Sequence, residues 1–440
     1  MSLLTSEGKQ KAGKLLLSSR GVKTASFRDF LYESFLSVED TLYDADSNPQ
    51  GIVNMSISTN RLMEDEITSR LMQGDAFNVL SLHHHYFTFS GTGEAKTSLT
   101  DFLNRHFHPV KPILPNNIII ANGVTSCLDA LGHVLCDPGD VIITPTPVYS
   151  RIVTDFRDVA DVCIEPLVLS QEVSIGMKFS LSAEALEDRI LELQEGGRRV
   201  KAFILLNPQN PLGDIYPPSL LTQLLDVCAR HELHFICDEI YALSVYGENA
   251  VFQSVLTLDL PDPRRTHVLW ALSKDFGVSG FRVGVIISKS DEVLSSLAPV
   301  MAFKNVPAIV QQAAATLLND TVWCDEFYLP TYKKRITGMT VKTSQAGLFL
   351  WFSVQPFLSN PTEEEEMKLY HELLDAGLSI VPGTLMYCTV PGWMRLVFTV
   401  RPPELEEGLR RLGVVLMSRK KRLAMTDQLI HSSAVAKENS

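Results

Sequence analysis

The sequence predicts an α/β fold with two domains: a large domain whose mostly parallel sheet is sandwiched by helices, and a smaller α+β domain. From about residue 116 onward, a short apolar β-rich run, a turn rich in Gly, Pro and Asn, and a helix-like segment follow one another several times. The apolar runs show no period-two alternation, which is typical of parallel strands covered on both faces. After about residue 325 this pattern ends, and the change indicates a separate unit.

The expected elements follow from these patterns in chain order. A helix over 94–106 precedes the large-domain strands, which we expect at 117–121, 141–144, 202–206, 234–237, 267–272 and 283–288. A further helix over 218–231 lies between the third and fourth of these strands. In the smaller domain, a helical linker leads to strands at 347–354 and 394–400 around a helix over 362–376.

These elements divide the chain into four parts. Residues 1–64 are expected to form an N-terminal segment that packs with the small domain, and 65–325 the large domain. Residues 326–422 are expected to form the small domain, and the polar residues 423–440 a mobile tail.

The composition excludes several classes of partner. The 440-residue chain carries 51 acidic and 39 basic side chains, a formal charge of −12, whereas nucleic acids and anionic membranes attract basic faces. No run of eighteen apolar residues occurs, and residues 1–20 lack the apolar core and cleavage site of a secretory signal. The seven cysteines are scattered without a CxxC pair, which favours a reducing compartment, so we expect a cytoplasmic protein.

Two cations stand in the otherwise apolar stretch 271–284. Burying an unpaired charge is costly, so Lys274 and Arg282 are expected to have dedicated partners. A lysine in apolar surroundings can present a neutral amine that forms a Schiff base with an aldehyde, and an arginine can hold a phosphate. Together they indicate pyridoxal 5′-phosphate (PLP), which carries both groups. The alternative is that the lysine ends a strand in solvent and the arginine pairs with a surface acid.

Polar residues follow the ends of several predicted strands. In parallel sheets, ligands bind at the carboxyl ends of the strands, so these residues are expected to meet in one site. They are Gly123-Val124-Thr125, Tyr149, the turn 207–213, Asp238 to Tyr241, and Ser273-Lys274.

Four motifs in order carry a family resemblance. They are Asn207-Pro-Gln-Asn-Pro-Leu-Gly213, Asp238-Glu-Ile-Tyr241, Ser273-Lys-Asp275 and Gly280-Phe-Arg-Val-Gly284. From about residue 50 to 415 the chain resembles the fold type I, class I/II aminotransferase family of PLP enzymes. It is most similar to the branch of 1-aminocyclopropane-1-carboxylate (ACC) synthases and their fungal relatives. The resemblance implies PLP fold type I, PLP as cofactor, an amino-acid substrate, and a homodimer whose partner completes each site.

The resemblance also implies roles for the motif residues around the ring of the cofactor. Lys274 corresponds to the lysine that forms the Schiff base and then moves the Cα proton, and Asp238 to the carboxylate at the pyridinium nitrogen. Tyr241 and Asn210 correspond to the hydrogen-bond partners of the ring 3′-oxygen, and Tyr149 to the aromatic residue stacked on the ring. Taken singly, Asp238 could cap a strand, Tyr149 could be a core residue, and the turn at Asn210 could be only a turn.

Other residues correspond to the groups that hold the phosphate and the substrate. Gly123, Val124 and Thr125 open a helix whose amides suit a phosphate, with Ser273 and Arg282 nearby. Arg395, in Trp393-Met-Arg-Leu, corresponds to the arginine that grips the substrate α-carboxylate, and the segment around Phe89 to a contribution from the partner subunit.

Three departures from the ACC synthase branch bear on the reaction. Thr59 stands where the branch has a glutamate, Phe89 where it has a tyrosine, and Ala271 where the family has a phosphate-binding serine. These changes disfavour ring closure to ACC and resemble those of fungal carbon–sulfur lyases of secondary metabolism, such as the gliotoxin type. We therefore expect β-elimination from a cysteine conjugate, giving a thiol, pyruvate and ammonia. An aminotransferase and a catalytically inactive PLP-fold binding protein are the alternatives.

Three further motifs are given no catalytic role. The run His83-His-His85 has no carboxylate or cysteine at ligand spacing, so no metal site is expected there, and we interpret it as polar surface or as an entrance to the site. The segment Gly91-Thr-Gly-Glu94 lacks the GK[ST] of a phosphate-binding loop and is expected to be a turn before a helix. The basic cluster Arg419-Lys-Lys-Arg422 is interpreted as a solvated helix end.

Overall fold

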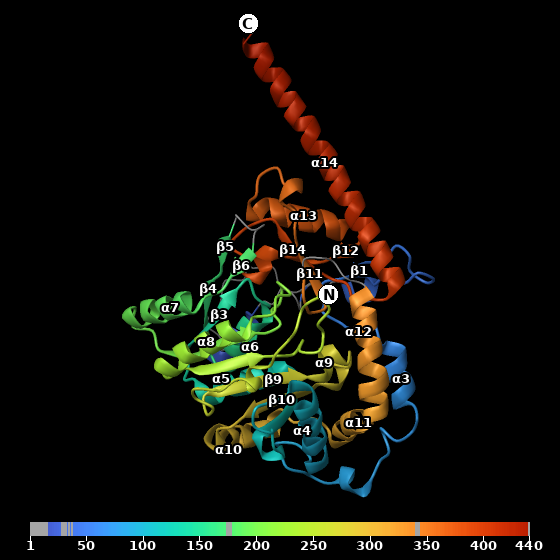
Figure 1. Ribbon diagram of the computed structural model, residues 1–440. Helices are drawn as coiled ribbons and strands as arrows, with labels where there is room; N and C mark the ends of the chain where they lie inside the picture. Colours follow the sequence, from blue (N-terminus) through green and yellow to red (C-terminus); the bar gives the residue numbers. More distant parts are fainter. Residues whose placement is uncertain are drawn as a thin grey trace.

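A seven-stranded sheet with strand order β2-β10-β9-β8-β7-β3-β4 forms the centre of the large domain in the computed structural model (Figure 1). The structure describes residues 16–27, 33, 36, 38–172, 178–338 and 344–438. The strands of this sheet are β2 (Ile118–Asn122), β3 (Val141–Thr146), β4 (Cys163–Val168), β7 (Val200–Leu206), β8 (His234–Asp238), β9 (Thr266–Ala271) and β10 (Val283–Ser288).

The predicted mostly parallel sheet is confirmed, with two differences. Strand β10 is antiparallel to both of its neighbours, β2 and β9, because the chain returns from β9 through residues 272–282, which include the short helices α9 (Leu272–Asp275) and η6 (Ser279–Phe281), to pair beside it. Strand β4 was not predicted. It pairs only with β3 at the edge of the sheet and is partly exposed, so it lacks the continuous apolar run of the inner strands.

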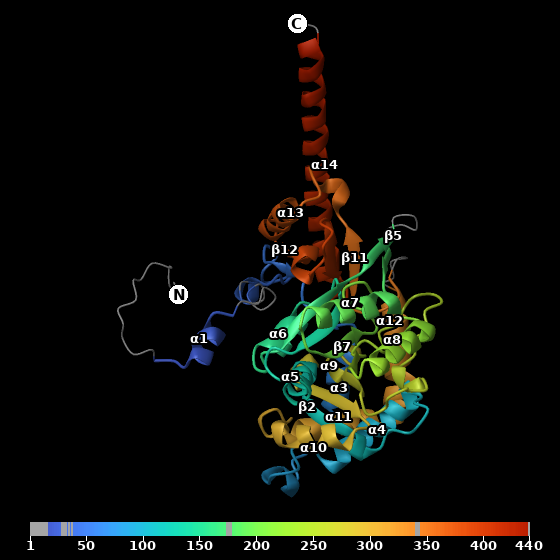
Figure 2. The same cartoon turned by 90° about the vertical axis from the view of Figure 1, so that its left-hand side faces the viewer.

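Helices cover both faces of this sheet, as Figure 2 shows from the side. One face is covered by α5 (Gly123–Leu135), α6 (Arg151–Arg157) and α10 (Asp291–Val300). The other face is covered by α4 (Gly93–Phe107), α7 (Ala183–Glu195), α8 (Pro218–Arg230) and α11 (Ala308–Asn319). Helix α8 illustrates the pattern: a proline starts it, and Leu221, Leu224, Leu225 and Cys228 form one buried stripe.

The small domain is built on an antiparallel sheet of order β11-β14-β13. Its strands are β11 (Phe349–Ser353), β13 (Val381–Pro382) and β14 (Trp393–Val397), and its helices are α13 (Glu363–Asp375) and α14 (Pro402–Glu438). The N-terminal segment joins this domain, because β1 (Val53–Asn54) pairs in parallel with β12 (Leu378–Ser379). The buried Arg411 of α14 reinforces this contact by donating to the carbonyl oxygens of Gly51 and Gly377.

A continuous helical stretch links the two domains. The π-helix η8 (Val322–Tyr328) runs directly into α12 (Leu329–Gly338), which rises from α11 toward the small domain in Figure 1. The remaining helices and strands are α1 (Ser19–Ala25), α3 (Glu64–Leu71), β5 (Ser170–Glu172), β6 (Lys178–Ser180) and α9 (Leu272–Asp275). Among the described residues, no helix is long and apolar enough to cross a membrane.

The last helix, α14, extends beyond the rest of the fold in both views (Figures 1 and 2). It continues as a helix through residues 423–438, so the secondary structure does not break where we expected the tail to begin. The basic cluster 419–422 is only partly solvated, because Arg419 is buried and paired with Glu365 at 2.6 Å and Glu372 at 3.2 Å. Mobility of the segment beyond residue 422 stays a prediction.

Candidate active site

Lys274 lies in the short helix α9, directly after the carboxyl end of β9. Its Nζ donates to the carbonyl oxygen of Ser58 over 2.5 Å, and the side chain of Asn60 donates to the Lys274 carbonyl over 2.8 Å. Burial, together with the positive charges of Arg395 and Arg282, lowers the pKa of Lys274 to about 8, against the opposing effect of Asp238. The lysine therefore points into the fold, and its amine loses its proton far more easily than that of a surface lysine.

Asp238 ends the neighbouring strand β8 and is 6% exposed. Its Oδ1 accepts a hydrogen bond of 3.1 Å from the backbone N–H of Ile240. Burial raises the pKa of Asp238 to about 7, while that hydrogen bond and the charge of Lys274 act in the opposite direction. A buried acid thus faces a basic lysine across two adjacent strand ends.

Asn210, Tyr241 and Arg395 form a hydrogen-bonded chain beside this pair. The side-chain nitrogen of Asn210 donates to the Tyr241 phenol over 3.4 Å, and Nη1 of Arg395 donates to the Asn210 side-chain oxygen over 3.0 Å. Arg395 is 1% exposed, and its Nη2 donates to the carbonyl oxygen of Ser56 over 2.5 Å. Within the described residues Arg395 has no carboxylate partner, and its buried Nε has no hydrogen-bond acceptor. This guanidinium can accept an anion.

Gly123, Val124 and Thr125 form the first turn of α5, immediately after β2. Gly123 has a φ of 76°, and a Cβ atom there would lie 2.2 Å from Nη2 of Arg282. Arg282 itself donates to the carbonyl oxygens of Ser279 and Asn122, over 3.1 and 3.4 Å. The guanidinium therefore lies against the glycine at a helix N-terminus, an arrangement suited to a phosphate. The described residues offer Arg282 no acidic partner, in contrast to the surface-pair alternative.

Tyr149 and Ser273 complete the group at the strand ends. The backbone N–H of Tyr149 donates to the Asn210 carbonyl over 3.1 Å, and burial raises the pKa of its phenol, with Asp155 adding to the effect. Ser273 is 5% exposed beside Lys274. Ala271, at the end of β9, is fully buried and pairs with Gly284 of β10.

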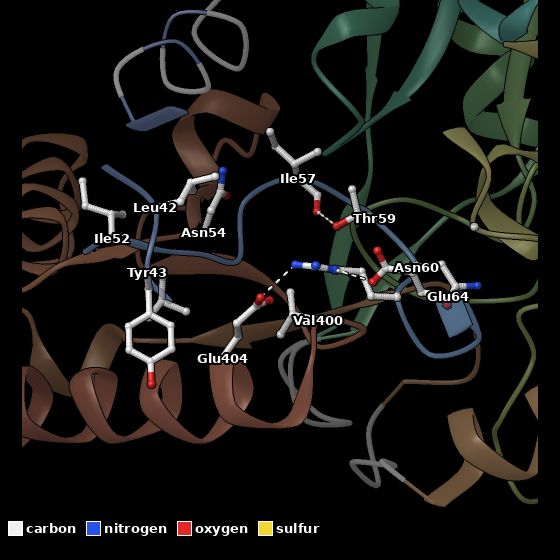
Figure 3. Close-up of a pocket in the computed structure, with 13 residues that line it drawn as sticks. Leu42, Tyr43, Ile52, Asn54, Ile57, Thr59, Asn60, Glu64, Val400 and Glu404 are labelled. Carbon is white, nitrogen blue, oxygen red and sulfur yellow. Dashed lines mark hydrogen bonds and ion pairs between the residues drawn. The ribbon is translucent and has the colours of Figure 1, made fainter. Parts of the chain in front are cut away.

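Residues 55–60, which we call the crossover segment, pass from the small domain to the large one over Lys274. Part of this segment lines a pocket of about 390 Å³, shown in Figure 3. Thr59 lines this pocket together with Asn60 and Gly277, and its hydroxyl donates to the Ile57 carbonyl over 3.4 Å. Arg61 and Glu404, which form an ion pair with an N–O distance of 2.8 Å, also line this pocket.

Phe89 stands apart from the other predicted site residues. It is 44% exposed, next to Ser90, whose carbonyl accepts a hydrogen bond of 2.9 Å from Ile120 of β2. No hydrogen bond or ring contact among the described residues joins Phe89 to Lys274, Asp238 or Arg395. Its predicted role in a partner's site stays a prediction.

Sequence reasoning singled out Thr59 of the crossover segment but missed the contacts that its neighbours make with the site. Ser56, Ser58 and Asn60 hold Arg395 and Lys274, but two of these bonds use backbone carbonyls, which no motif can reveal. The expected turn before α4 fits the structure, because Thr92 caps α4 by accepting from Ala95 N–H. The His83 ring accepts from Leu80 N–H, and the role of the histidine run stays a prediction.

Comparison with known proteins supplies the family. The family model for aminotransferases of class I and II matches residues 51–412. The chain belongs to this family. The predicted family, fold class and cofactor are thereby confirmed, and the protein is a PLP-dependent enzyme of the aminotransferase class I and II family.

Curated relatives place this aminotransferase-family protein near ACC synthase-like proteins. The mouse ACC synthase-like protein 1 is 36% identical over 417 residues, which cover 91% of this chain and 83% of the mouse protein. The human protein named probable inactive ACC synthase-like protein 2 is 34% identical, with 92% of this chain and 74% of the human protein covered.

Solved structures share the fold at low identity. The kynurenine aminotransferase of Pyrococcus horikoshii superposes with a TM-score of 0.71 at 20% identity, covering 92% of this chain and 97% of that chain. The aspartate aminotransferase of Rhizobium meliloti gives a TM-score of 0.71 at 19% identity, covering 91% and 99%. These likenesses bear on the fold of this protein only.

Proposed function

We propose that the enzyme binds PLP between the strand ends and uses Lys274 to remove the Cα proton of an amino acid. The observation that carries this proposal is the lysine's environment: its amine donates to the Ser58 carbonyl of the crossover segment, and burial and nearby cations lower its pKa to about 8. A general base works best when its pKa is close to the ambient pH. PLP, when bound, supplies an electron sink that makes the Cα–H bond acidic.

The surrounding residues fit this cofactor. Gly123 to Thr125 and Arg282 form a cradle that a Cβ atom would fill, and we assign the phosphate to it, with Ser273 beside it. Asp238 is a buried acid that would keep the ring nitrogen protonated. We assign Tyr241 and Asn210 to the ring 3′-oxygen and Tyr149 to the ring face, since the three residues are joined by hydrogen bonds.

We assign the substrate α-carboxylate to Arg395. Its guanidinium is buried without a carboxylate partner in the described structure, and leaving such a cation unpaired is costly. A carboxylate can accept two parallel N–H bonds from one guanidinium, which fixes the amino acid's orientation as well as its affinity. This orientation would present the Cα–H bond to Lys274 at the end of β9.

For the reaction, we propose β-elimination from a cysteine conjugate in a cytoplasmic pathway of secondary metabolism. Lys274 takes the Cα proton, a Cα–Cβ double bond forms, and the electron pair of the Cβ–S bond leaves with sulfur as a thiol. Reaction of the remaining enamine with one water gives pyruvate and ammonia. The support is chemical: Thr59, Phe89 and Ala271 replace groups of the ring-closing branch, while the residues for proton removal are retained.

Transamination is the second candidate, favoured by the family model that matches most of the chain. It differs in the fate of the proton, which Lys274 would return to the cofactor, and it requires a 2-oxo acid as acceptor. An inactive protein is a third reading, because the human relative described above is named as probable inactive. Lys274, Asp238 and Arg395 lie close enough together for their charges to interact, and this retained arrangement argues against an inactive protein.

One assay separates these reactions. Purified protein reconstituted with PLP is incubated with S-substituted cysteines, with and without a 2-oxo acid, and thiol and pyruvate are measured against a Lys274→Ala control. Stoichiometric thiol and pyruvate without a 2-oxo acid support the lyase. Turnover only with a 2-oxo acid identifies an aminotransferase, and the absence of both with bound PLP supports an inactive protein.

We also propose that the enzyme acts as a homodimer. The segment before α4 exposes Leu82, Tyr86 and Phe89, at 52%, 102% and 44% exposure, which is unfavourable for large apolar side chains in water. A second copy covering this face would bring Phe89 to the partner's site. Light scattering of the purified protein tests this, and a monomer at assay concentration would contradict it.

A further inference from the structure

Asp275, the residue after Lys274, is completely buried at 0% exposure. Its Oδ2 accepts hydrogen bonds from the Trp270 indole N–H over 2.9 Å and from the Leu243 backbone N–H over 3.2 Å. Its Oδ1 accepts from the Ser244 hydroxyl over 2.6 Å. No ion pair among the described residues involves Asp275, so hydrogen bonds alone compensate its burial.

The three donors come from the elements that build the active site. Trp270 belongs to β9, which ends in the Lys274 turn, while Leu243 and Ser244 belong to the loop that follows Asp238 and contains Tyr241. Through these hydrogen bonds, the Asp275 carboxylate holds the turn that contains Lys274 against the loop that contains Tyr241. A shift of one relative to the other would break at least one of these bonds.

The same residue reaches the linker between the domains. The Tyr328 hydroxyl of η8 donates to the Asp275 carbonyl over 3.0 Å, and the Tyr332 hydroxyl of α12 lies 2.8 Å from Ser244 Oγ. Because the Ser244 proton is given to Asp275, Tyr332 must donate to Ser244. The Tyr328 ring also stacks on Phe276, with 5.0 Å between ring centroids. Lys274 is thus connected to the helical linker through its neighbour.

We propose that Asp275 is a positioning residue, which fixes Lys274 relative to the loop of Asp238 and Tyr241 and to the linker between the domains. The inference rests on the proposed role of Lys274 toward PLP. It assigns to Asp275 no contact with cofactor or substrate. Its effect is exerted through the hydrogen-bonded turn that carries the lysine.

Two substitutions separate the geometry of this residue from its charge. In Asp275→Asn, the amide oxygen can still accept from Trp270 and Leu243, and the amide nitrogen can donate to Ser244. The hydroxyl of Ser244 then donates to Tyr332, so the network survives with its direction reversed. Asp275→Leu has a similar size but leaves all three donors without an acceptor.

The test uses bound PLP as its readout, independently of turnover. For wild type, Asp275→Asn, Asp275→Leu and the control Asp140→Asn, PLP affinity and the pH midpoint of its visible absorption are measured, with melting temperatures. Asp140 is a buried carboxylate at the start of β3, paired with Arg199 and away from the lysine, so it reports the cost of losing a buried charge.

We expect Asp275→Leu to bind PLP about tenfold or more weakly and to shift the absorption midpoint, since a lost buried network displaces the amine. Asp275→Asn should stay within about threefold of wild type, and Asp140→Asn should change only the melting temperature. A folded Asp275→Leu variant with the wild-type absorption titration would overturn the inference, as would an Asn variant as weak as Leu.

If Asp275→Leu does not fold, the absorption midpoints of Ser244→Ala and Tyr332→Phe test the inference instead. Each removes one member of the chain and should shift the absorption midpoint in the same direction by a smaller amount. Unchanged midpoints in both would overturn the inference. A wild-type protein that forms no visible PLP band would instead refute the proposed function.

Discussion

The guanidinium of Arg395 donates a 3.0 Å hydrogen bond to the side-chain oxygen of Asn210, and this bond joins the small domain to the large one. Arg395 stands in β14, and Asn210 follows β7 at the carboxyl edge of the main sheet. The same amide donates to Tyr241 through its nitrogen. Asn210 therefore connects Arg395, the proposed binding group for the substrate carboxylate, to Tyr241 in the loop assigned to the cofactor ring. The two domains meet at this arginine.

The first prediction concerns this anchor. Arg395→Lys keeps the charge but loses the planar fork, so kcat/KM for amino-acid substrates should fall by about 10- to 100-fold, mostly through KM. PLP binding should change little. Arg411→Lys is the matched control, because Arg411 is also a buried arginine bonded to carbonyl oxygens but lies on α14. It should lower the melting temperature and leave KM unchanged. An unaltered KM in Arg395→Lys would remove the carboxylate assignment.

The second prediction follows from the lowered pKa of Lys274. An amine reacts only when it is deprotonated, so its rate should reach half of its maximum near the pKa of about 8, instead of near the ordinary value above 10. The measurement is the pH dependence of acylation of Lys274 in the cofactor-free protein, followed by peptide mass spectrometry. The exposed Lys421 in the same sample is the internal control. Equal profiles for the two lysines would contradict the prediction.

The third prediction tests the phosphate cradle. Gly123→Ala places a Cβ atom 2.2 Å from Arg282 Nη2, which must displace the guanidinium, so PLP affinity should fall by about tenfold or more. Gly139→Ala has a similar backbone, with φ of +87°, but nothing lies within 4 Å of the added atom. Both variants should lose about 1 kcal/mol of stability from backbone strain. Equal PLP affinities in the two would argue against the cradle.

The sequence predicted those site residues whose role can be inferred from the motif in which they stand. Lys274 was found because an ionisable group inside an apolar run needs a partner, and Asp238 because a polar residue follows a predicted strand; both sit at strand ends. The crossover segment was singled out only for Thr59, and its contacts with Lys274 were not found, because Asn60 is separated from Lys274 by 214 residues of sequence and Ser58 contributes a backbone carbonyl. Asp275 was visible only as part of a motif. Its function in the network depends on Tyr328 and Tyr332, whose positions follow from tertiary packing.

The limits of the fold prediction have a similar origin. Periodicity finds elements that bury a continuous face, so the inner strands were predicted within a few residues, whereas the edge strand β4 was missed. The antiparallel direction of β10 depends on the path of the chain after the Lys274 turn, which composition does not determine. Polar composition suggested a tail after residue 422, but polar residues such as Lys421 also suit an exposed helix, and α14 continues.

The last prediction concerns stability and pH. His267 and His234 lie 3.0 Å apart, nitrogen to nitrogen, and burial lowers the pKa of His267 to about 3 and that of His234 to about 4. Both folded-state pKa values lie below the pKa of an unfolded histidine, which is near 6.5. As the pH falls below about 6.5, the unfolded state therefore binds more protons than the folded state. This pair therefore costs stability on acidification, up to ~1.4 kcal/mol per pH unit for each ring.

Three buried acids act in the opposite sense. Burial raises the pKa of Asp238 and Asp275 to about 7 and that of Glu239 to about 8, so they favour the folded state on acidification. The informative quantity is thus the difference between wild type and His267→Gln in unfolding free energy, measured with urea at pH 6.5 and pH 5. The wild type should lose about 1 to 2 kcal/mol more than the variant over this range. His133→Gln, at an exposed position, should behave as the wild type. Equal losses in wild type and His267→Gln would show that the buried pair does not resist protonation.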